Sequence, residues 1–360
     1  MTFSHYAMNS ITSGNISRLC SLIDSAGYIT VTAHMKPDGD ATGSSYALMR
    51  FLGAAGKKAC IVFPDRIPES LAFIIDPEDR GKIISAADDI ASATHAVASS
   101  DLIFCLDFNR FSESRCGKMA DILSGSGAMK VLIDHHLSPE TERFGLIFSE
   151  TEISSTSELL FWILMAMPQT GGNAAMLPPP ARKALLAGMT TDTNNFGNSV
   201  FPSTLKMASA LLEAGTDRDD ILYHLYNEYG ENRVRLLGRL LYHDMKITGD
   251  GVAYMILDRK TLSEFDIHEG DTEGFVNRPL EIGKVRMSCL LKEDDGFFRV
   301  SLRSKRGISA NRCAMEHFHG GGHELAAGGR LYMPGDIASP EEAAGYVEKA
   351  THEFMTAGNE

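Results

Sequence analysis

Short, nearly continuous hydrophobic runs alternate with helix-like segments through the first half of the chain. The runs are YITVTA (28–33), ACIVF (59–63), DLIFCLDF (101–108), MKVLIDHH (129–136) and GLIF (145–148). Such runs are typical of strands that are buried on both faces of a parallel sheet. Helix-like segments at 41–55 and 154–167 accompany them. The alternation predicts an α/β domain with a mainly parallel sheet flanked by helices.

The second half of the chain has a different pattern. The stretch PQTGGNAAMLPPP (168–180) predicts a surface loop, with a helix resuming at Ala181. Residues 203–243 are helical in pattern and increasingly charged. Beyond Gly251, VAYMIL, VRMSCLL and FFRVSLRS alternate like antiparallel strands, and PEEAAGYVEKATHEFM predicts a last helix. We therefore expect a catalytic domain at 1–215, a helical connector at 216–248, and a smaller α/β domain with a mixed or antiparallel sheet at 249–360.

Length and composition narrow the class of protein. The 360 residues exceed what one ordinary core holds. No apolar stretch reaches eighteen residues, and the first residues lack the basic and apolar regions of a signal peptide. We expect a cytoplasmic protein without a membrane partner. The six cysteines are scattered without a CxxC pair, which favours reduced thiols over a disulfide or zinc framework.

The net charge of −13 argues against a protein that coats long nucleic acid by diffuse electrostatics. A small anionic substrate stays compatible with it, because bound metal ions or a local basic patch reverse the field at a site. Such a patch lies between Lys284 and Arg312, where eight Lys and Arg residues face three acidic ones.

Acidic and histidine side chains collect at the predicted strand ends. They are His34, Asp38 and Asp40 after the first strand, Asp107 at the end of the third, Asp134, His135 and His136 at the end of the fourth, and Asp192 after a helix. Each has an ordinary alternative: PDGD forms a type I turn and helix cap, Asp107 caps a loop, the histidines are solvated, and Asp192 ends its helix. In open α/β sheets, however, ligands bind at the carboxyl ends of strands, so the joint occurrence favours one shared site.

The residue types at these positions point to metal chemistry. Carboxylates and imidazoles without thiolates suit Mn²⁺ or Mg²⁺ better than structural zinc. Four aspartates and two or three histidines are enough for two ions. Two metals bridged by a carboxylate and a water lower the pKa of that water, so that it can attack a phosphorus centre in line.

The second half contributes GGGHELAAGG (320–329). Its glycines let the backbone approach a ligand closely, and amides at a following helix start can bind an anion. A glycine-rich turn between a helix and a strand is the ordinary alternative. Beside the basic segment with Arg303, Lys305 and Arg306, the stretch is a candidate site for a nucleotide phosphate or base, with His323 as a donor.

These motifs resemble a known family. HMKPDGDATGS, LDFN, IDHH and the Asp192 segment are similar, in order, to the four motifs of the DHH phosphoesterase superfamily, and GGGHELAAGG is similar to the glycine-rich motif of its associated C-terminal domain. The motifs span 34–192 and about 300–329. In length and layout the chain most resembles the stand-alone bacterial enzymes that act as oligoribonuclease (nanoRNase) and as phosphatase of 3′-phosphoadenosine 5′-phosphate.

The resemblance implies a role for each motif residue. His34, Asp38 and Asp107 would hold one metal, and Asp40, Asp107, His135 and Asp192 the second, with Asp107 bridging. His136 would face the scissile phosphate, and Asp134 would orient the histidine pair. The implied substrate-binding residues are Asn109, Arg303, Ser304, Gly321, Gly322 and His323.

The resemblance also implies cofactors, substrates and alternatives. Mn²⁺ is the expected ion, with Mg²⁺ or Co²⁺ as alternatives. Short RNA oligonucleotides and small nucleotides are the expected substrates, with no long duplex, and the oligomeric state stays open, a homodimer included. A phosphodiesterase of cyclic di-AMP or pApA is the nearest alternative. A polyphosphatase is less favoured because polyphosphate needs no base-binding domain. A nucleotide-binding module without catalysis is less favoured because no metal-ligand position departs from the pattern.

Overall fold

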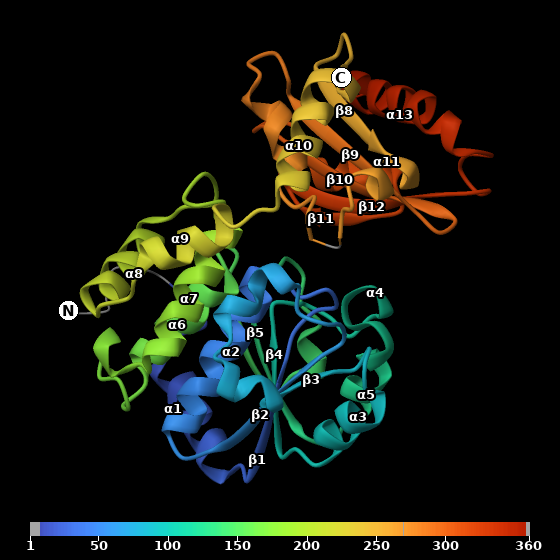
Figure 1. Cartoon of the computed structure of the whole chain (residues 1–360). Helices are drawn as coiled ribbons and strands as arrows, with labels where there is room; N and C mark the ends of the chain where they lie inside the picture. The colour runs from blue at the N-terminus through green and yellow to red at the C-terminus, as the bar shows by residue number, and fades with distance from the viewer. Residues whose placement is uncertain (1–7, 269, 358–360) are drawn as a thin grey trace. The chain divides into compact units, whose positions relative to one another are not determined.

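The computed structural model describes residues 8–268 and 270–357. The chain divides into two compact units, Met1–Glu228 and Tyr229–Glu360, which are described separately (Figure 1). The boundary lies inside the predicted connector, and the expected division into 1–215, 216–248 and 249–360 stays a prediction.

Unit 1 is built on one parallel sheet with six strands, in the order β3-β2-β1-β4-β5-β6. The strands are β1 (Tyr28–Thr32), β2 (Lys58–Phe63), β3 (Ile83–Ser85), β4 (Leu102–Leu106), β5 (Met129–Asp134) and β6 (Leu146–Ser149). The chain proceeds outward from β1 in one direction and then returns to β4 on its other side. The strand order therefore reverses between β1 and β4, the position where open α/β sheets bind their ligands.

Helices cover both faces of this sheet, as predicted. They are α1 (Ser13–Ser25), α2 (Gly39–Ala54), α3 (Ile90–Ala98), α4 (Glu113–Cys116), α5 (Ala120–Gly125), α6 (Thr156–Ala166), α7 (Pro179–Asp192), α8 (Pro202–Glu213) and α9 (Arg218–Tyr226). The larger core packs α1, α2, α6 and α7 on one face, and a smaller core packs α3 and α5 on the other (Figure 1). Central strands alternate between the two cores, since Val131 and Ile133 face the first and Leu132 faces the second. This explains their continuous hydrophobicity.

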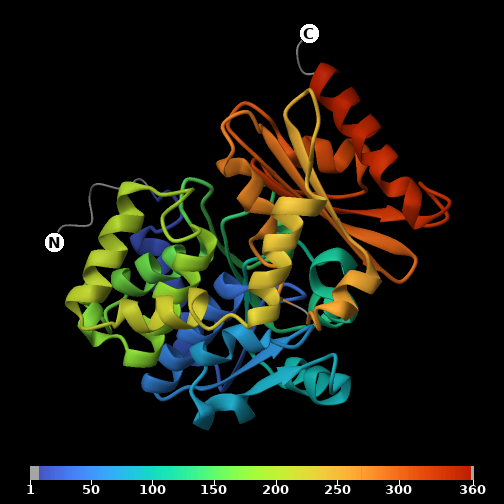
Figure 2. The same ribbon diagram turned by 45° about the horizontal axis from the view of Figure 1, so that its top comes forward.

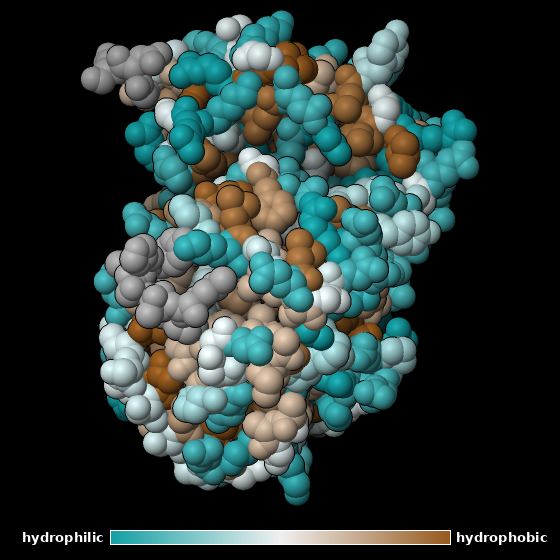
Figure 3. Space-filling model, turned by 90° about the vertical axis from the view of Figure 1, so that its left-hand side faces the viewer, coloured by the Kyte–Doolittle hydropathy of each residue, from teal (hydrophilic) through white to brown (hydrophobic). Residues whose placement is uncertain are grey.

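The outer helices α8 and α9 have fewer buried residues than α2 and α6. Figure 3 faces the side on which Figure 1 places them, and hydrophobic side chains there are interspersed with hydrophilic ones. The exposed large hydrophobic residues of α8 are Leu205 and Leu212. In the described part of the chain, no helix is long and apolar enough to cross a membrane.

Unit 2 contains a mixed sheet with six strands, in the order β11-β12-β10-β9-β8-β7. The strands are β7 (Lys246–Ile247), β8 (Val252–Leu257), β9 (Met287–Asp294), β10 (Phe297–Ser304), β11 (Gly321–His323) and β12 (Ala326–Tyr332). The helices are α10 (Glu231–Arg239), continued by a π-helical turn (Leu240–Asp244), α11 (Arg259–Glu264), α12 (Ala310–His317) and α13 (Ala343–Ala357). Both Figure 1 and Figure 2 show α13 along one face of the sheet, where it shares a core with β8, β9 and β10.

Two details of the sequence-based expectation were wrong. The antiparallel pattern expected beyond Gly251 fails between β8 and β9, which are parallel, because the intervening chain crosses over through α11 and a 3-10 helix at 275–281. The stretch GGGHELAAGG does not start a helix either: it forms the antiparallel hairpin β11–β12, and α12 precedes it. The smaller unit nevertheless has the mixed sheet that the fold class predicted.

Candidate metal centre

The first unit brings seven of the predicted residues to the carboxyl ends of β1, β4 and β5. Three groups of donor atoms each lie within 4.8 Å of one another: His34 with Asp38 and Asp107, Asp40 with Asp107 and His135, and Asp107 with Asp134 and His136. Asp192, at the last position of α7, joins them through His135, whose Nε2 lies 3.5 Å from Asp192 Oδ2. Asp107 is therefore common to all three groups.

Asp107 lies immediately beyond β4 and its side chain is 3% exposed. His34 Nε2 lies 3.4 Å from Asp107 Oδ2, and His135 Nε2 lies 3.3 Å from Asp107 Oδ1, so each carboxylate oxygen faces a different histidine. The backbone of Asp107 has a φ of 60°. Non-glycine residues rarely adopt this left-handed conformation, and where they do the strain is commonly found at functional sites.

His34 is oriented by its own loop. Its Nδ1 lies 2.8 Å from the carbonyl oxygen of Met35. Because a carbonyl can only accept, Nδ1 carries the hydrogen, and Nε2 is the nitrogen that faces Asp107 and Asp38, the latter at 3.8 Å. A neutral imidazole held this way presents a lone pair, which is how histidine binds a metal.

The PDGD turn has two functions at once. Asp38 caps α2, since its Oδ1 accepts hydrogen bonds of 3.0 Å from the amides of Asp40 and Ala41. Its side chain is 59% exposed, and its Oδ2 faces His34. Asp40 lies two residues further along the chain and is buried. The two carboxylates therefore belong to different donor groups: Asp38 lies with His34 and Asp107, and Asp40 lies with Asp107 and His135.

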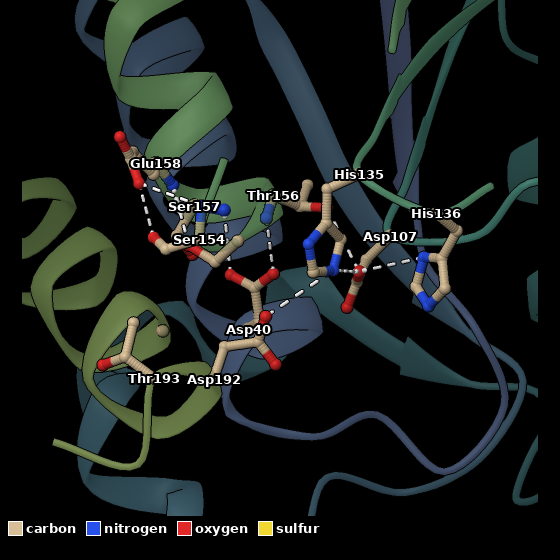
Figure 4. Close-up of polar contacts among 12 residues, drawn as sticks. Asp40, Asp107, His135, His136, Ser154, Thr156, Ser157, Glu158, Asp192 and Thr193 are labelled. Carbon is tan, nitrogen blue, oxygen red and sulfur yellow. Dashed lines mark hydrogen bonds and ion pairs between the residues drawn. The ribbon is translucent and has the colours of Figure 1, made fainter. Parts of the chain in front are cut away.

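Asp40 is held by the first turn of α6 rather than by its own helix. Thr156 N donates to Asp40 Oδ2 at 2.6 Å and Ser157 N donates to Oδ1 at 2.8 Å, while Thr156 Oγ1 donates to Asp107 at 3.1 Å (Figure 4). The hydrophobic pattern at 154–167 predicted only a helix, without this part of the site. The signal was present as Ser155-x-x-Glu158 before a hydrophobic run, the pattern of a helix capping box.

Glycines allow α2 and α7 to approach this turn. A Cβ on Gly43 would lie 2.4 Å from the carbonyl oxygen of Ala184, and one on Gly188 would lie 2.2 Å from Ser157 Oγ. A Cβ on Gly39, between the two aspartates, would meet the side chain of Thr191 at 2.3 Å. The backbones of three elements that carry or hold candidate ligands are thus in close contact.

The carboxylates and imidazoles of the group shift one another's pKa. Burial alone would lower the pKa of His34, but hydrogen bonds and charge from Asp107 and Asp38 raise it well above its usual range. Burial would raise the pKa of Asp107, yet His135 and His34 lower it well below its ordinary value. Burial and the neighbouring charges of Asp107 and Asp192 raise the pKa of Asp40 well above normal.

Asp192 completes this excess of negative charge. Burial, together with the charges of Asp107 and Asp38, raises the pKa of Asp192 to about 7 against the opposing effect of His135. Like-charged carboxylates raise one another's pKa, and a divalent cation would remove that repulsion. The donor set therefore fits metal ions: oxygen and imidazole ligands, a fixed histidine tautomer, and carboxylates that lack sufficient positive charge of their own.

His136 differs from the other histidines. Its Nδ1 lies 2.7 Å from Asp134 Oδ1 and 3.7 Å from Asp107 Oδ1 (Figure 4). Asp134 is fully buried at the end of β5, and its Oδ2 has no hydrogen-bond partner among the described residues. Donation from Nδ1 to Asp134 fixes the orientation of the His136 ring and assigns the hydrogen to Nδ1.

Asn109 lies two residues beyond Asp107 and is 7% exposed. Its Nδ2 donates to the carbonyl of Leu137 at 2.7 Å, which ties it to the loop that follows the histidine pair. Its Oδ1 is buried and has no hydrogen-bond partner within the described chain. A buried acceptor without a donor is costly, so the position favours a ligand that donates a hydrogen bond.

The remaining predicted residues belong to unit 2. Arg303 on β10 and His323 on β11 both pair with Ala326 of β12, so they occupy the same register of three neighbouring strands. Ser304 is buried and its hydroxyl donates to the carbonyl of Ile308 at 2.6 Å. Gly322 donates its amide to Asn311 Oδ1 at 2.8 Å.

The glycines of this hairpin have a packing reason of their own. A Cβ on Gly320 would lie 1.9 Å from the carbonyl oxygen of Gly328, and one on Gly322 would lie 2.6 Å from that of Ala326. Gly322 also has a φ of 157°. Gly321 pairs directly with Gly328. The run therefore lets β11 pack closely on β12, and its expected role towards a substrate stays a prediction.

Comparison with known proteins gives family matches in both units. Residues 28–189 match the DHH family, N-terminal domain, and residues 249–349 match the DHHA1 domain. The chain is similar to a bifunctional oligoribonuclease and PAP phosphatase of Bacillus subtilis, with 28% identity over 88% of this chain and 92% of that protein. It is also similar to a cyclic-di-AMP phosphodiesterase of Geobacillus thermodenitrificans, with 24% identity over 94% of this chain but 49% of that protein.

A solved structure is similar along the whole chain. It is an exopolyphosphatase-related protein from Bacteroides fragilis, with 35% identity, a TM-score of 0.88, and coverage of 97% of this chain and 98% of that chain. The similarity extends over both units.

Proposed function

The chain belongs to the DHH family and is a hydrolase acting on phosphoester bonds, and from this we propose that it cleaves very short RNA to mononucleotides. We propose that it also converts 3′-phosphoadenosine 5′-phosphate to AMP and phosphate. The observation that carries the proposal is the pair of donor groups, His34–Asp38–Asp107 and Asp40–Asp107–His135, that share Asp107. Relatives named for both activities cover most of the chain.

The family is metal-dependent, and the proposed ligands follow the two donor groups. His34, Asp38 and Asp107 would hold one ion. Asp40, Asp107, His135 and Asp192 would hold the other. Mn²⁺ is the ion we propose, because the ligands are carboxylates and imidazoles without a thiolate. When bound, two such ions activate a water for attack and neutralise the phosphate charge.

The protein's own residues position the groups that react. His34 and His135 present Nε2 to the carboxylates, and Asp107 spans both donor groups. Asp134 holds His136 at 2.7 Å, so His136 would offer a proton or a hydrogen bond from Nε2 to the scissile phosphate or the leaving oxygen. The unpartnered Oδ1 of Asn109 would accept from a hydroxyl of the nucleotide.

In unit 2 the proposed substrate-binding residues are Arg303, Ser304, Gly321, Gly322 and His323. Their support is the shared register of Arg303 and His323, which both pair with Ala326. An arginine and a histidine at the same register on the two strands that flank β12 suit a phosphate or a base edge. A cytoplasmic location and the oligomeric state stay predictions.

The test is a substrate panel with purified protein and Mn²⁺. Labelled RNAs of two, five and about twenty nucleotides and 3′-phosphoadenosine 5′-phosphate are scored for turnover and product identity. We expect the dinucleotide and pentamer to be cleaved much faster than the long RNA, because a chain with a net charge of −13 retains an extended polyanion poorly. Preference for the longest RNA would contradict the proposal.

One alternative substrate has a specific observation in its favour. Cyclic-di-AMP phosphodiesterases from Geobacillus thermodenitrificans and Listeria monocytogenes match 94% and 85% of this chain. Cyclic di-AMP, pApA and polyphosphate therefore belong in the same panel. Faster turnover of either dinucleotide than of short RNA would favour this alternative while leaving the metal centre intact.

A further inference from the structure

Glu158 is a fully buried carboxylate that is not among the proposed metal ligands. Its Oε2 accepts hydrogen bonds from Ser154 N at 3.1 Å, Ser154 Oγ at 2.5 Å and Thr204 Oγ1 at 2.7 Å, and its Oε1 accepts from Trp162 Nε1 at 3.3 Å (Figure 4 shows the Ser154 bonds). These four donors are uncharged. Burying a carboxylate is costly even with such donors, so an apolar residue would serve the core better unless the carboxylate holds something in place.

The hydrogen bonds of Glu158 fix the turn that starts α6. Ser154 is tied twice to its Oε2, and the hydroxyl of Ser155 accepts from the amide of Glu158 at 3.0 Å. These reciprocal bonds resemble a capping box. In the usual box the glutamate accepts from the amide of the N-cap residue, here Ser155, whereas Glu158 accepts from the amide of the preceding residue, Ser154. The two residues inside the box, Thr156 and Ser157, are those whose amides hold Asp40.

The orientation of Asp40 therefore depends on this turn. Each of its oxygens accepts one amide hydrogen, at 2.6 and 2.8 Å, and each retains one lone pair for another partner. Thr156 also donates to Asp107 from Oγ1, so one residue is bonded to two candidate ligands (Figure 4). A shift of the α6 turn would move both carboxylates together. Thr204, near the start of α8, reaches the same carboxylate of Glu158 and anchors the turn from outside.

We propose that Glu158 is a positioning residue for the metal centre. Through Ser154 and the first turn of α6 it fixes the amides that aim Asp40, so the affinity for the ion at Asp40 depends on a residue that does not touch it. The proposal rests on the proposed role of Asp40 as a metal ligand. Partners that orient metal ligands typically change metal affinity by about 10- to 100-fold when they are substituted.

The test measures Mn²⁺ binding without substrate, by the EPR signal of free Mn²⁺ and by calorimetry. Glu158→Gln keeps the shape but replaces one acceptor by a donor. If the Gln carbonyl faces Ser154 and Thr204, its NH₂ group opposes Trp162 Nε1. We expect one of two Mn²⁺ ions to bind about 10-fold more weakly. Adding Trp162→Phe removes the opposing donor, and we expect the double variant to regain most of the lost affinity.

Two reference variants make the result specific. Asp79→Asn removes another buried and richly bonded carboxylate of unit 1, and we expect it to lower the unfolding midpoint while Mn²⁺ affinity is unchanged. Asp40→Asn should abolish the same Mn²⁺ ion that Glu158→Gln weakens. If Glu158→Gln does not fold, Ser154→Ala removes the 2.5 Å bond alone and should weaken the same ion by a smaller factor.

The outcomes separate the two proposals. If Glu158→Gln, or Ser154→Ala in its place, binds both ions with wild-type affinity while Asp40→Asn loses one, the positioning role is overturned and the metal centre stands. If Asp40→Asn binds Mn²⁺ like the wild type, the proposed metal centre itself fails. Recovery of affinity by Trp162→Phe supports the positioning role, because a general loss of stability would not be reversed by removing a further hydrogen bond.

Discussion

Helix α2 contributes residues to two buried groups of carboxylates, and the pKa of the central carboxylate is lowered in one group and raised in the other. Near its middle, Tyr46 and Arg50 bond to Asp79, which Lys82 contacts as well at 2.7 Å. Burial would raise the pKa of Asp79, but the hydrogen bonds from Lys82 and Arg50 lower it. At the start of the helix, Asp40 is as deeply buried, yet its pKa is raised.

The difference is the sign of the neighbours. Asp79 is hydrogen-bonded to two cations and a phenol. Carboxylates of Asp76 and Glu78 lie nearby, but the bonds from Lys82 and Arg50 outweigh them and lower the pKa of Asp79. Asp40 is surrounded by backbone amides and by further carboxylates, with histidines as the nearby cationic groups. Burial alone is therefore no guide to function: a carboxylate with its own counter-charge stabilises the fold, whereas carboxylates that share too little positive charge mark a place for an added cation.

Removing one carboxylate from each group should separate a loss of activity from a loss of stability. Asp107→Asn deletes the charge common to the three donor groups, and we expect turnover of a labelled dinucleotide to fall by more than about 100-fold. Asp79→Asn should lower the free energy of unfolding by about 1–3 kcal/mol. The effect is no larger because Arg50 and Lys82 reach solvent, which screens their charges. Turnover should stay nearly unchanged. Urea unfolding and kcat measure the two effects. Similar turnover losses in both variants would contradict the distinction.

A second prediction uses the pH dependence of metal binding. The pKa of Asp192 is raised to about 7, so its carboxyl group is largely protonated at pH 6 and ionised at pH 8 in the metal-free protein. A metal that binds there must displace the proton, and apparent Mn²⁺ affinity should rise by about tenfold over this interval from that proton alone. The raised pKa values of His34 and His135 add in the same direction. Calorimetry in buffers of different ionisation enthalpy would count the released protons; an affinity independent of pH would refute this assignment.

The smallest expected effect concerns a matched pair of glycines. Gly188→Ala would press a methyl group against Ser157 Oγ and towards Asp40 Oδ1, which lies 3.2 Å from the added Cβ. We expect it to lower the free energy of unfolding by about 1–3 kcal/mol and to weaken Mn²⁺ binding a few-fold.

Gly53→Ala is the control, because no atom lies within 4 Å of its added Cβ. It should be neutral or stabilise by up to about 1 kcal/mol, since alanine loses less backbone entropy in a helix. Thermal unfolding and Mn²⁺ titration of both variants provide the measurement. Equal Mn²⁺ affinity in both would show that the α7 approach does not bear on Asp40.

Much of the first unit could be predicted from the sequence because its signals are local. Hydrophobic runs with β-branched residues identified β1, β2, β4, β5 and β6 to within two residues at either end. The strand β3 was missed, since three half-buried residues leave no pattern. In unit 2 the parallel pairing of β8 and β9 was missed, because the alternation of residues along one strand does not depend on the direction of the neighbouring strand.

The candidate ligands were predicted because chemistry and position coincide in the chain: Asp and His follow strands, and strand ends meet at one edge of a sheet. What holds those ligands could not be read in this way. Thr156, Ser157 and Glu158 lie more than a hundred residues from Asp40, and their bonds to it or around it depend on how α6 docks.

Residue type and periodicity identified the side chains of the candidate metal centre and placed most of them at strand ends, because both signals are local in the chain. Which carboxylate is balanced by cations depends on folding as well, since Arg50 reaches Asp79 from 29 residues away and the amides that hold Asp40 lie on α6. The tertiary structure also decided that PDGD is both a helix cap and part of the candidate metal centre. The physical reason is that charge balance and hydrogen-bond orientation arise between segments that folding brings together.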